Sequence, residues 1–323
     1  MEGRQFPSVE GFAVWRHDRR EPKAGVVVVA GPTAGGKTAL AVALCQRLGG
    51  EVVSADSMQI YRGMEIATAK PTAEELRAVP HHLIGIADPG ERFSVARYAS
   101  LARAAIADIH ARGNLPVLCG GTGLYIQAIT EGLTLTPGEF ERGAWGSWED
   151  LRAIDPTAAA KIHPNDSKRI THALALYRAT GVTLTQQNVR SRPEERPYRA
   201  KMIFLHARDR QRLYGRIDLR VDQMLTAGLL QEAREQRQEA RDTAAQAIGY
   251  KELEPYFLGQ CSLEEAIAHL KQETRRYAKR QLSWFRRTAR EWNEREPGSC
   301  MEVFLEDADL EEKALLFCKG MVV

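Results

Sequence analysis

Hydrophobic and polar positions follow one another in blocks that predict strands and helices in turn. Residues 26–29 are four consecutive valines between Gly25 and Gly31, a pattern typical of a strand buried on both faces of a parallel sheet. Residues 38–48 have a helical composition and end at a glycine pair, and residues 51–54 predict a second short strand. The pattern therefore indicates a strand, helix and strand unit of an α/β fold.

A further strand follows a long amphipathic helix. Ser94 is the expected N-cap of this helix and Gly113 its end, and the apolar positions between them recur at helical spacing. These positions are Tyr98, Leu101, Ala102, Ala105, Ile106 and Ile109. Residues 115–119 then predict a buried strand that leads into a glycine-rich turn at residues 120–123. Ligands of open parallel sheets gather at such carboxyl ends of strands.

The character of the sequence changes after about residue 135. We expect a mainly helical module over residues 136–198, inserted into a core of residues 25–135 and 199–323 whose C-terminal part is helical. Residues 202–205 predict the strand on which the chain returns to the sheet. Residues 1–24 form an N-terminal extension that we expect to be dispensable. Two capping boxes mark helix starts, at Thr72 with Glu75 and at Ser262 with Glu265.

Composition favours a folded cytoplasmic protein. Hydrophobic residues make up 44% and charged residues 27% of the chain, and no apolar run approaches the roughly 20 residues that cross a bilayer. The five cysteines are far apart and lack metal-binding spacing, so we expect free thiols. We assign His81 and His82 hydrogen-bonded structural roles, because no second ligand pattern accompanies them. We expect no membrane partner, and nothing demands more than a monomer.

The clearest chemical signal is a glycine-rich segment that fits the pattern GxxxxGK[ST] between a strand and a helix. Its glycines allow backbone N–H groups to converge on phosphate oxygens, and Lys37 adds a full positive charge. The Thr38 hydroxyl is the expected protein ligand of Mg²⁺. This phosphate loop consists of Gly31, Pro32, Thr33, Ala34, Gly35, Gly36, Lys37 and Thr38. A phosphate-binding site at the end of the first strand is therefore expected.

A phosphate loop does not by itself identify the reaction, because kinases, ATPases, GTPases and some transferases share it. The sequence contains no Asn-Lys-x-Asp segment of the kind that reads guanine, and no apolar strand that ends in a clear Walker B aspartate. A kinase that uses ATP on a small molecule therefore stays open at this point. A noncatalytic RNA-binding protein with a vestigial loop is another alternative, although the intact Lys37 and Thr38 argue against decay.

Three further segments carry a specific pattern. They are Asp56-Ser-Met-Gln-Ile-Tyr-Arg-Gly-Met, Gly120-Gly-Thr-Gly-Leu-Tyr125 and Gln246-Ala-Ile-Gly-Tyr-Lys-Glu252. Together with the phosphate loop they resemble the bacterial tRNA dimethylallyltransferase family, and shorter matches extend the resemblance over roughly residues 26–290. One departure is Gly35, which stands where the family usually has serine and which we expect to leave the backbone cradle intact.

The resemblance implies transfer of a dimethylallyl group from dimethylallyl diphosphate to the N6 amine of adenosine 37 in tRNA. The diphosphate and Mg²⁺ would occupy the phosphate loop, so ATP would be a misleading inference. Asp56 is the expected base, although a turn aspartate explains it equally well from sequence alone. Thr122 would bond the amine or orient the base, unless its segment is a structural turn. Arg216 and Arg220 would help to hold the diphosphate, unless they form an exposed charged face.

The resemblance also implies an RNA surface assembled from five parts of the chain. An adenine turned out of the anticodon loop would enter a channel beside Asp56, where the Gln59 amide would read its edge. The basic residues 271–290 would meet RNA phosphates, unless they form only a solvated helix face. His172 replaces a usual arginine. A transferase of free adenine nucleotides, the remaining alternative, would need no inserted module. The expected contacts are Asp56, Ser57, Met58, Gln59, Thr122, Lys168, Arg169, His172, Gln246, Gly249, Tyr250, Lys251, Arg275 and Arg276.

Overall fold

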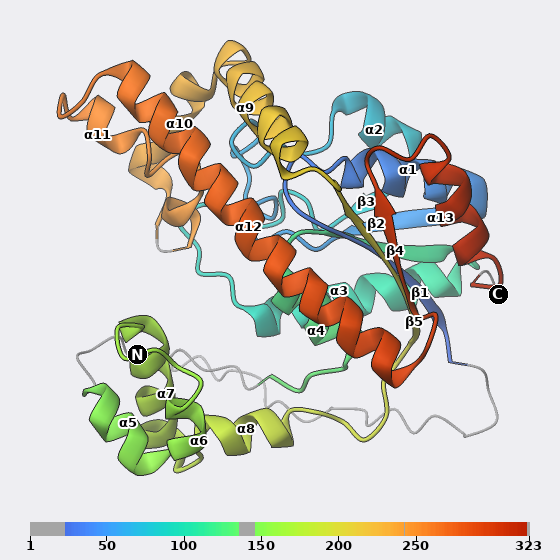
Figure 1. Ribbon diagram of the computed structural model, residues 1–323, viewed down its shortest axis with the longest axis horizontal. Helices are drawn as coiled ribbons and strands as arrows, with labels where there is room; N and C mark the ends of the chain where they lie inside the picture. The colour runs from blue at the N-terminus through green and yellow to red at the C-terminus, as the bar shows by residue number, and fades with distance from the viewer. Residues whose placement is uncertain (1–22, 136–145, 242, 322–323) are drawn as a thin grey trace, which may run out of the picture.

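A parallel sheet organises the chain, which the computed structural model describes for residues 23–135, 146–241 and 243–321. The six strands lie in the order β3-β2-β4-β1-β5-β6, and every neighbouring pair is parallel (Figure 1). They are β1 (Gly25–Ala30), β2 (Gly50–Ser54), β3 (His81–His82), β4 (Leu115–Gly120), β5 (Arg199–His206) and β6 (Cys300–Phe304). The turns that follow β1, β2 and β4 therefore meet at one edge of the sheet.

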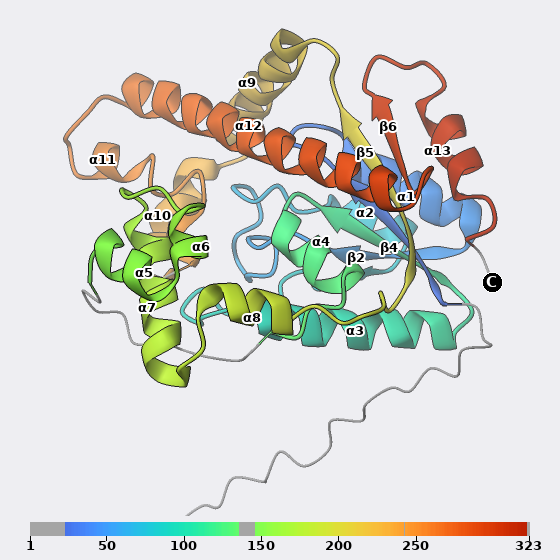
Figure 2. The same cartoon turned by 60° about the horizontal axis from the view of Figure 1, so that its bottom comes forward.

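The valine run becomes the central strand because both of its faces are covered by helices. Val26 and Val28 belong to the apolar cluster on one face, and Val27 and Val29 to the cluster on the other. All four side chains are 0% exposed. Figure 2 shows the two helical layers on either side of the sheet. One layer contains α3 (Val95–Ala111), α4 (Gly123–Thr130) and α12 (Leu263–Arg295), and the other contains α1 (Lys37–Leu48) and α13 (Leu310–Cys318).

Further helices lie beyond the carboxyl ends of the strands. They are α2 (Ala73–Ala78), α9 (Arg210–Thr226), α10 (Leu229–Glu239), the 3-10 helix η1 (Ala244–Gln246) and α11 (Glu254–Phe257). Figure 1 shows α9, α10 and α11 at this end of the molecule, from which α12 runs back across the sheet. Side chains from α9 and α12 consequently face the turns after β1 and β2.

The inserted module contains α5 (Trp148–Ile154), α6 (Pro156–Ala159), α7 (Ser167–Thr180) and α8 (Leu184–Arg190). These helices pack around their own apolar cluster, which includes Leu151, Ile162 and Leu174. Figure 1 shows them as a group apart from the sheet. The two connecting segments are tied together where Thr134 N donates to Ser191 O at 2.8 Å. The described part of the module is therefore helical, as expected.

Most of the predicted elements are confirmed. The strands expected at residues 26–29, 51–54, 115–119 and 202–205 are β1, β2, β4 and β5, and both capping boxes are closed by reciprocal hydrogen bonds. The place of Leu101 in the buried stripe of α3 is wrong, because this side chain is 38% exposed. The sequence did not reveal the two edge strands β3 and β6. Within the described residues, no helix has the length and apolarity needed to span a membrane.

Candidate active site

A cavity of about 720 Å³ opens at the carboxyl ends of β1, β2 and β4. The phosphate loop forms one wall, the segment after β2 forms a second, and α9 with the first half of α12 closes the remaining sides. Segments that are distant in the sequence therefore line one space. This position agrees with the rule that ligands of open parallel sheets bind at the carboxyl ends of the strands.

The phosphate loop has the backbone geometry that its glycines allow. Gly31 adopts a φ of 155°, and a Cβ atom there would lie 2.1 Å from the carbonyl oxygen of Leu205. Gly36 has a φ of 74° and is the N-cap of α1. Gly35 N donates to Pro32 O at 3.2 Å, so the loop forms its turn with glycine at the position of the usual serine. Thr33 to Thr38 line the cavity, whereas Gly31 and Pro32 are buried behind it.

Three cations surround this loop. Lys37 lines the cavity, and its burial lowers the pKa of its ammonium group to about 8, with the nearby Arg220 as a further lowering influence. Arg216 donates from Nε to the carbonyl oxygen of Ala34 at 2.9 Å. Arg216 and Arg220 are one turn apart on α9 and both line the cavity, so the helix presents them together to the loop.

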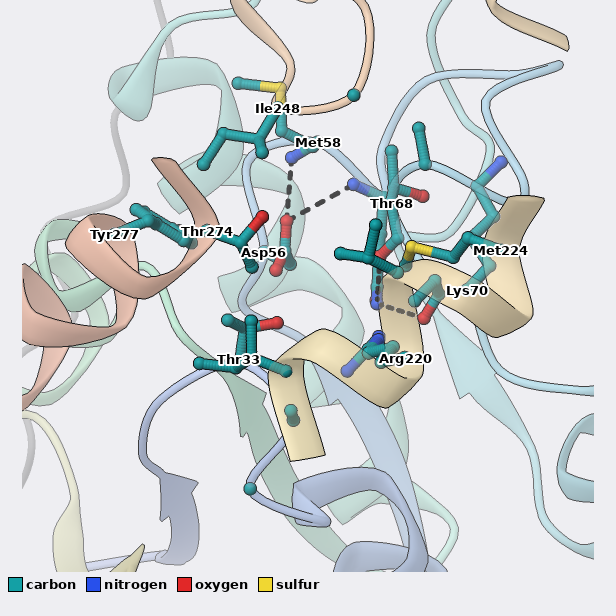
Figure 3. A pocket seen from close by; sticks show the side chains of 18 of the residues that line it. Thr33, Asp56, Met58, Thr68, Lys70, Arg220, Met224, Ile248, Thr274 and Tyr277 are labelled. Atoms are coloured by element: carbon teal, nitrogen blue, oxygen red, sulfur yellow. Dashed lines mark hydrogen bonds between the residues drawn. The ribbon is translucent and has the colours of Figure 1, made fainter. Parts of the chain in front are cut away.

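Arg220 is the most informative of these cations. Burial lowers the pKa of its guanidinium group. In the described residues, no carboxylate lies within ion-pair distance of it. Arg220 and Thr33 both line the cavity (Figure 3). Desolvated positive charge without a paired carboxylate is costly, and an anionic ligand would remove that cost. The three cations therefore form an anion site.

Asp56 enters the same cavity from the segment after β2, whereas Arg220 enters it from α9 (Figure 3). Its Oδ1 atom accepts hydrogen bonds from Met58 N at 2.9 Å and from Gln59 N at 3.4 Å. Asp56 is thus a turn aspartate and a cavity residue at once, so the two interpretations of the sequence do not compete. Within the described residues both side-chain hydrogen bonds end on Oδ1, which leaves Oδ2 available to a substrate.

Thr122 holds the Asp56 segment through two hydrogen bonds. Its Oγ1 atom accepts from Ser57 N at 3.0 Å, and its own N–H donates to Ala55 O at 3.0 Å. The two neighbours of Asp56 in the chain are therefore both held by Thr122. Thr122 is not among the residues that line the cavity, so the geometry favours orientation of the base over contact with the amine.

Two residues expected to contact tRNA are instead engaged within the protein. The Gln59 amide accepts from Ser54 Oγ at 3.1 Å and donates to the carbonyl oxygen of Ala69 at 3.1 Å. It holds the segment around residue 69, so base reading by Gln59 would require exchange of these bonds. Tyr250 is buried, and its hydroxyl donates to Glu232 at 3.0 Å. The Tyr250 side chain is therefore used within the protein, and its contact with RNA stays a prediction.

Glu232 and Gln281 belong to the site and were not expected from the sequence. Glu232, buried on α10, accepts from the backbone N–H groups of Glu65, Ile66 and Ala67 at 2.7–2.9 Å. It therefore fixes the segment that continues into the cavity wall at Thr68. Gln281, buried on α12, bonds to Thr33 and Gly121. Gln281 ends the segment Thr274-Arg-Arg-Tyr-Ala-Lys-Arg-Gln281, one of the shorter matches to the family, and this match was the available signal. Glu232 is an isolated glutamate on a charged helix and gave no signal.

The remaining predicted contacts with RNA divide into paired and unpaired groups. Arg275 is paired with Asp218, and Arg276 with Glu273. Lys279, Arg280, Arg286 and Arg290 are exposed on α12, and no ion pair within the described residues involves them. Lys168, Arg169 and His172 lie in the first two turns of α7, and Gln246, Gly249 and Lys251 line the cavity edge together with Ser57 and Met58. The free positive charge of α12 thus begins at Lys279, about two turns after Lys271, because Lys271 is paired with Asp222.

The two histidines have the structural roles that we assigned to them. His82 Nε2 lies 2.7 Å from Glu51 Oε2, and His81 Nδ1 lies 2.9 Å from the carbonyl oxygen of Val79. Glu51 is buried and also accepts from Arg112 and Asn114, and these bonds lower the pKa of its carboxyl group to about 2 against the opposing effect of burial. The five cysteines are free.

Comparison with known proteins agrees with the site. The model of the family described as IPP transferase matches residues 59–288, and that of isopentenyl transferase matches residues 24–84. The chain is 48% identical over 276 residues to the tRNA dimethylallyltransferase of Geobacillus thermodenitrificans, covering 81% of this chain and 87% of the relative. It is 45% identical over 284 residues to that of Geobacter metallireducens, covering 83% and 92%.

Solved structures show the same similarity. The full-length tRNA isopentenylpyrophosphate transferase of Bacillus halodurans superposes with a TM-score of 0.68 and 42% identity, covering 93% of this chain and 97% of that one. A eukaryotic dimethylallyltransferase acting on tRNA superposes with a TM-score of 0.75 and 29% identity, covering 90% of this chain and 78% of that one. This similarity shows that the chain belongs to the IPP transferase family, whose site here has a phosphate loop, a carboxylate and two arginines around one cavity.

Proposed function

We propose that this protein transfers the dimethylallyl group of dimethylallyl diphosphate to the N6 amine of adenosine 37 in tRNA. The observation that carries the proposal is the cavity itself, which holds an anion site on one side and the carboxylate of Asp56 on the other. The anion site consists of Lys37, Arg216 and Arg220. Relatives of high identity are named tRNA dimethylallyltransferase. A diphosphate leaving group and an amine that must lose a proton need these two charges on opposite sides of the reacting carbon.

The reaction separates charge in a direction that the cavity supports. The bond from the allylic carbon to the diphosphate oxygen breaks, and the bond from this carbon to N6 forms. Negative charge then grows on the diphosphate, where Lys37, Arg220 and the backbone N–H groups of the loop stabilise it. Asp56 Oδ2 accepts the proton that N6 releases. Once both substrates fill the cavity they would exclude water, which would otherwise react with the allylic carbon.

The residues of the loop fit Mg²⁺ as the cofactor. The Thr38 hydroxyl lines the cavity at the start of α1, directly after Lys37. Mg²⁺ prefers oxygen ligands and is commonly held by one or two protein groups together with substrate phosphates, so one hydroxyl beside a diphosphate site suffices. Thr38 would hold the ion, which would neutralise charge on the diphosphate oxygens. Replacement of Thr38 by valine should raise the Mg²⁺ concentration needed for half-maximal activity, whereas replacement by serine should not.

The tRNA would lie against two surfaces that carry exposed cations, of which Arg169 is also paired with Asp166 at 3.0 Å. Lys279, Arg280, Arg286 and Arg290 line one side of α12, and Arg280 also reaches the cavity. The first turns of α7 supply Lys168 and Arg169 from the inserted module. Cations on both sides of an RNA stem fix its position through phosphates, while the flipped base enters the cavity. This arrangement supports the inserted module as an RNA-binding element and disfavours a free nucleotide as acceptor.

The test is mass spectrometry of the nucleosides of unmodified tRNA after incubation with protein, Mg²⁺ and dimethylallyl diphosphate. We expect N6-isopentenyladenosine at position 37 with the wild-type protein and none with the Asp56→Ala variant. A parallel incubation with ATP and radiolabelled γ-phosphate tests the kinase alternative. Phosphoryl transfer without prenylated tRNA would overturn the proposal.

A further inference from the structure

Gln281 joins the two halves of the active site across a long stretch of sequence. Its Oε1 atom accepts from the backbone N–H of Thr33 in the phosphate loop at 2.8 Å. Its Nε2 atom donates to the carbonyl oxygen of Gly121, in the turn after β4, at 3.1 Å. The side chain is only 5% exposed, so both polar ends are used inside the protein. One amide therefore spans the distance between the leaving-group loop and the β4 turn.

The β4 turn connects this amide to the base. Thr122 follows Gly121 directly and holds both chain neighbours of Asp56, because its N–H donates to Ala55 O and its Oγ1 accepts from Ser57 N. The order of contacts is then loop, Gln281, turn and base segment. A shift of the loop relative to the turn would consequently change the distance from the diphosphate to Asp56.

The packing around these bonds leaves little room for adjustment. A Cβ atom on Gly121 would lie 2.1 Å from Gln281 Nε2, and one on Gly120 would lie 2.2 Å from the carbonyl oxygen of Ala55. Both glycines are therefore needed for close approach, which explains the Gly-Gly of this turn without a phosphate ligand. Trp284, about one turn after Gln281 on α12, also packs against this turn, because a Cβ atom on Gly123 would lie 2.1 Å from its Nε1 atom. The helix α12 thus contacts the turn at two successive positions.

We propose that Gln281 is a positioning residue, which sets the distance between the bound diphosphate and Asp56 so that the amine, not water, attacks the allylic carbon. The inference rests on the proposed prenyl transfer. If the Gln281 amide is removed, Thr33 N and Gly121 O lose their partner, and the phosphate loop and the β4 turn can move apart. Water then competes: its oxygen bonds to the allylic carbon, the carbon–oxygen bond to diphosphate breaks, and the proton of water goes to solvent. The products are dimethylallyl alcohol and diphosphate.

The experiment compares Gln281→Met, Gln281→Glu and the wild-type protein, with Gln272→Met as control for an exposed glutamine on the same helix. For Gln281→Met we expect kcat for tRNA prenylation to fall by about 10- to 100-fold, which is the effect of a small misplacement of reacting groups. The KM for dimethylallyl diphosphate should change little. The ratio of dimethylallyl alcohol to prenylated adenosine should rise, a result that simple loss of folded protein cannot give because it lowers both products equally.

The Gln281→Glu variant supplies a test that does not depend on the methionine variant being stable. The introduced carboxyl group can still accept from Thr33 N, but it can donate to Gly121 O only when protonated. The activity of Gln281→Glu relative to that of the wild-type protein should therefore rise as the pH falls. The activity of Gln272→Met relative to that of the wild-type protein should stay constant. Equal product ratios and parallel pH profiles for all variants would overturn the inference. Absence of prenylated tRNA with the wild-type protein would instead overturn the proposed function.

Discussion

The ammonium group of Lys37 donates a hydrogen bond to the carbonyl oxygen of Pro32, 2.7 Å away in its own loop. Burial holds the pKa of this group at about 8, so a small rise in pH above neutrality already removes part of its charge. A bound diphosphate favours the charged form and raises the pKa again. Proton uptake and ligand binding are therefore coupled at this residue.

The affinity for dimethylallyl diphosphate should consequently depend on pH in one direction. We expect a constant dissociation constant below about pH 8 and a weakening of up to about tenfold per pH unit above it, because free Lys37 is then neutral. Titration calorimetry between pH 6.5 and 9.5 measures the dissociation constant. The Lys37→Met variant should bind more weakly with a flat profile, and a sloping profile in that variant would assign the effect to another group.

Replacement of Arg220 by methionine should have opposite effects on binding and stability. Methionine retains much of the apolar stem but removes a desolvated charge, so the free energy of unfolding should stay constant or rise by about 1 kcal/mol. The KM for dimethylallyl diphosphate should rise by about 10- to 100-fold, the value of a charge-assisted hydrogen bond. Urea denaturation and initial rates measure the two effects. The control is Arg212→Met, an exposed arginine of the same helix, and equal KM values in both variants would contradict the assignment.

Asp56→Asn separates the two roles of Asp56. Asparagine retains the Oδ1 acceptor for Met58 N and Gln59 N, but it cannot accept the amine proton. We expect kcat to fall by about 10²- to 10⁴-fold with little change in stability. Asp56→Ala should lose the same activity and also about 1 kcal/mol of unfolding free energy, because the turn loses its acceptor. Single-turnover rates and urea denaturation distinguish the variants, and near-normal turnover by Asp56→Asn would exclude Asp56 as the base.

The buried carboxylate of Glu232 should be essential for stability. Its replacement by alanine leaves the N–H groups of residues 65–67 and the Tyr250 hydroxyl without their acceptor. We expect a loss of about 3 kcal/mol of unfolding free energy. Tyr250→Phe removes only one of these bonds and should cost about 1 kcal/mol. Denaturation midpoints in urea measure both, and equal losses would show that the backbone contacts contribute nothing.

The parts of the fold that sequence predicts well are those encoded by neighbouring residues. The phosphate loop, the valine strand and the capping boxes each depend on positions within a few residues, so their patterns are complete when read locally. The edge strands β3 and β6 are short, and β6 buries only some of its side chains, so neither produces a strand pattern. Leu101 is apolar at a helical position, but only the packing of α3 decides which side of the stripe meets the sheet.

The residues of the site likewise divide into those that local sequence reveals and those that only the fold reveals. Lys37 and Asp56 were found because a motif or a resemblance marks them. Tyr250 and Gln59 were assigned to tRNA because the resemblance places their segments near RNA, and only the fold shows their partners within the protein. Gln281 and Thr33 are separated by 248 positions, a distance at which no spacing rule operates. The pairing of Arg276 with Glu273, three residues earlier, could have been inferred from the sequence.

The central place of β1 has a consequence for synthesis on the ribosome. One edge of β1 pairs with β4, but its other partner, β5, follows only after about three fifths of the chain has been made. Until β5 docks, a strand of four valines exposes an unpaired edge, which is a template for aggregation. Nascent chains that stop within the inserted module should therefore need a chaperone. Once the chain returns from that module, β5 pairs with the free edge of β1 and removes the site of aggregation.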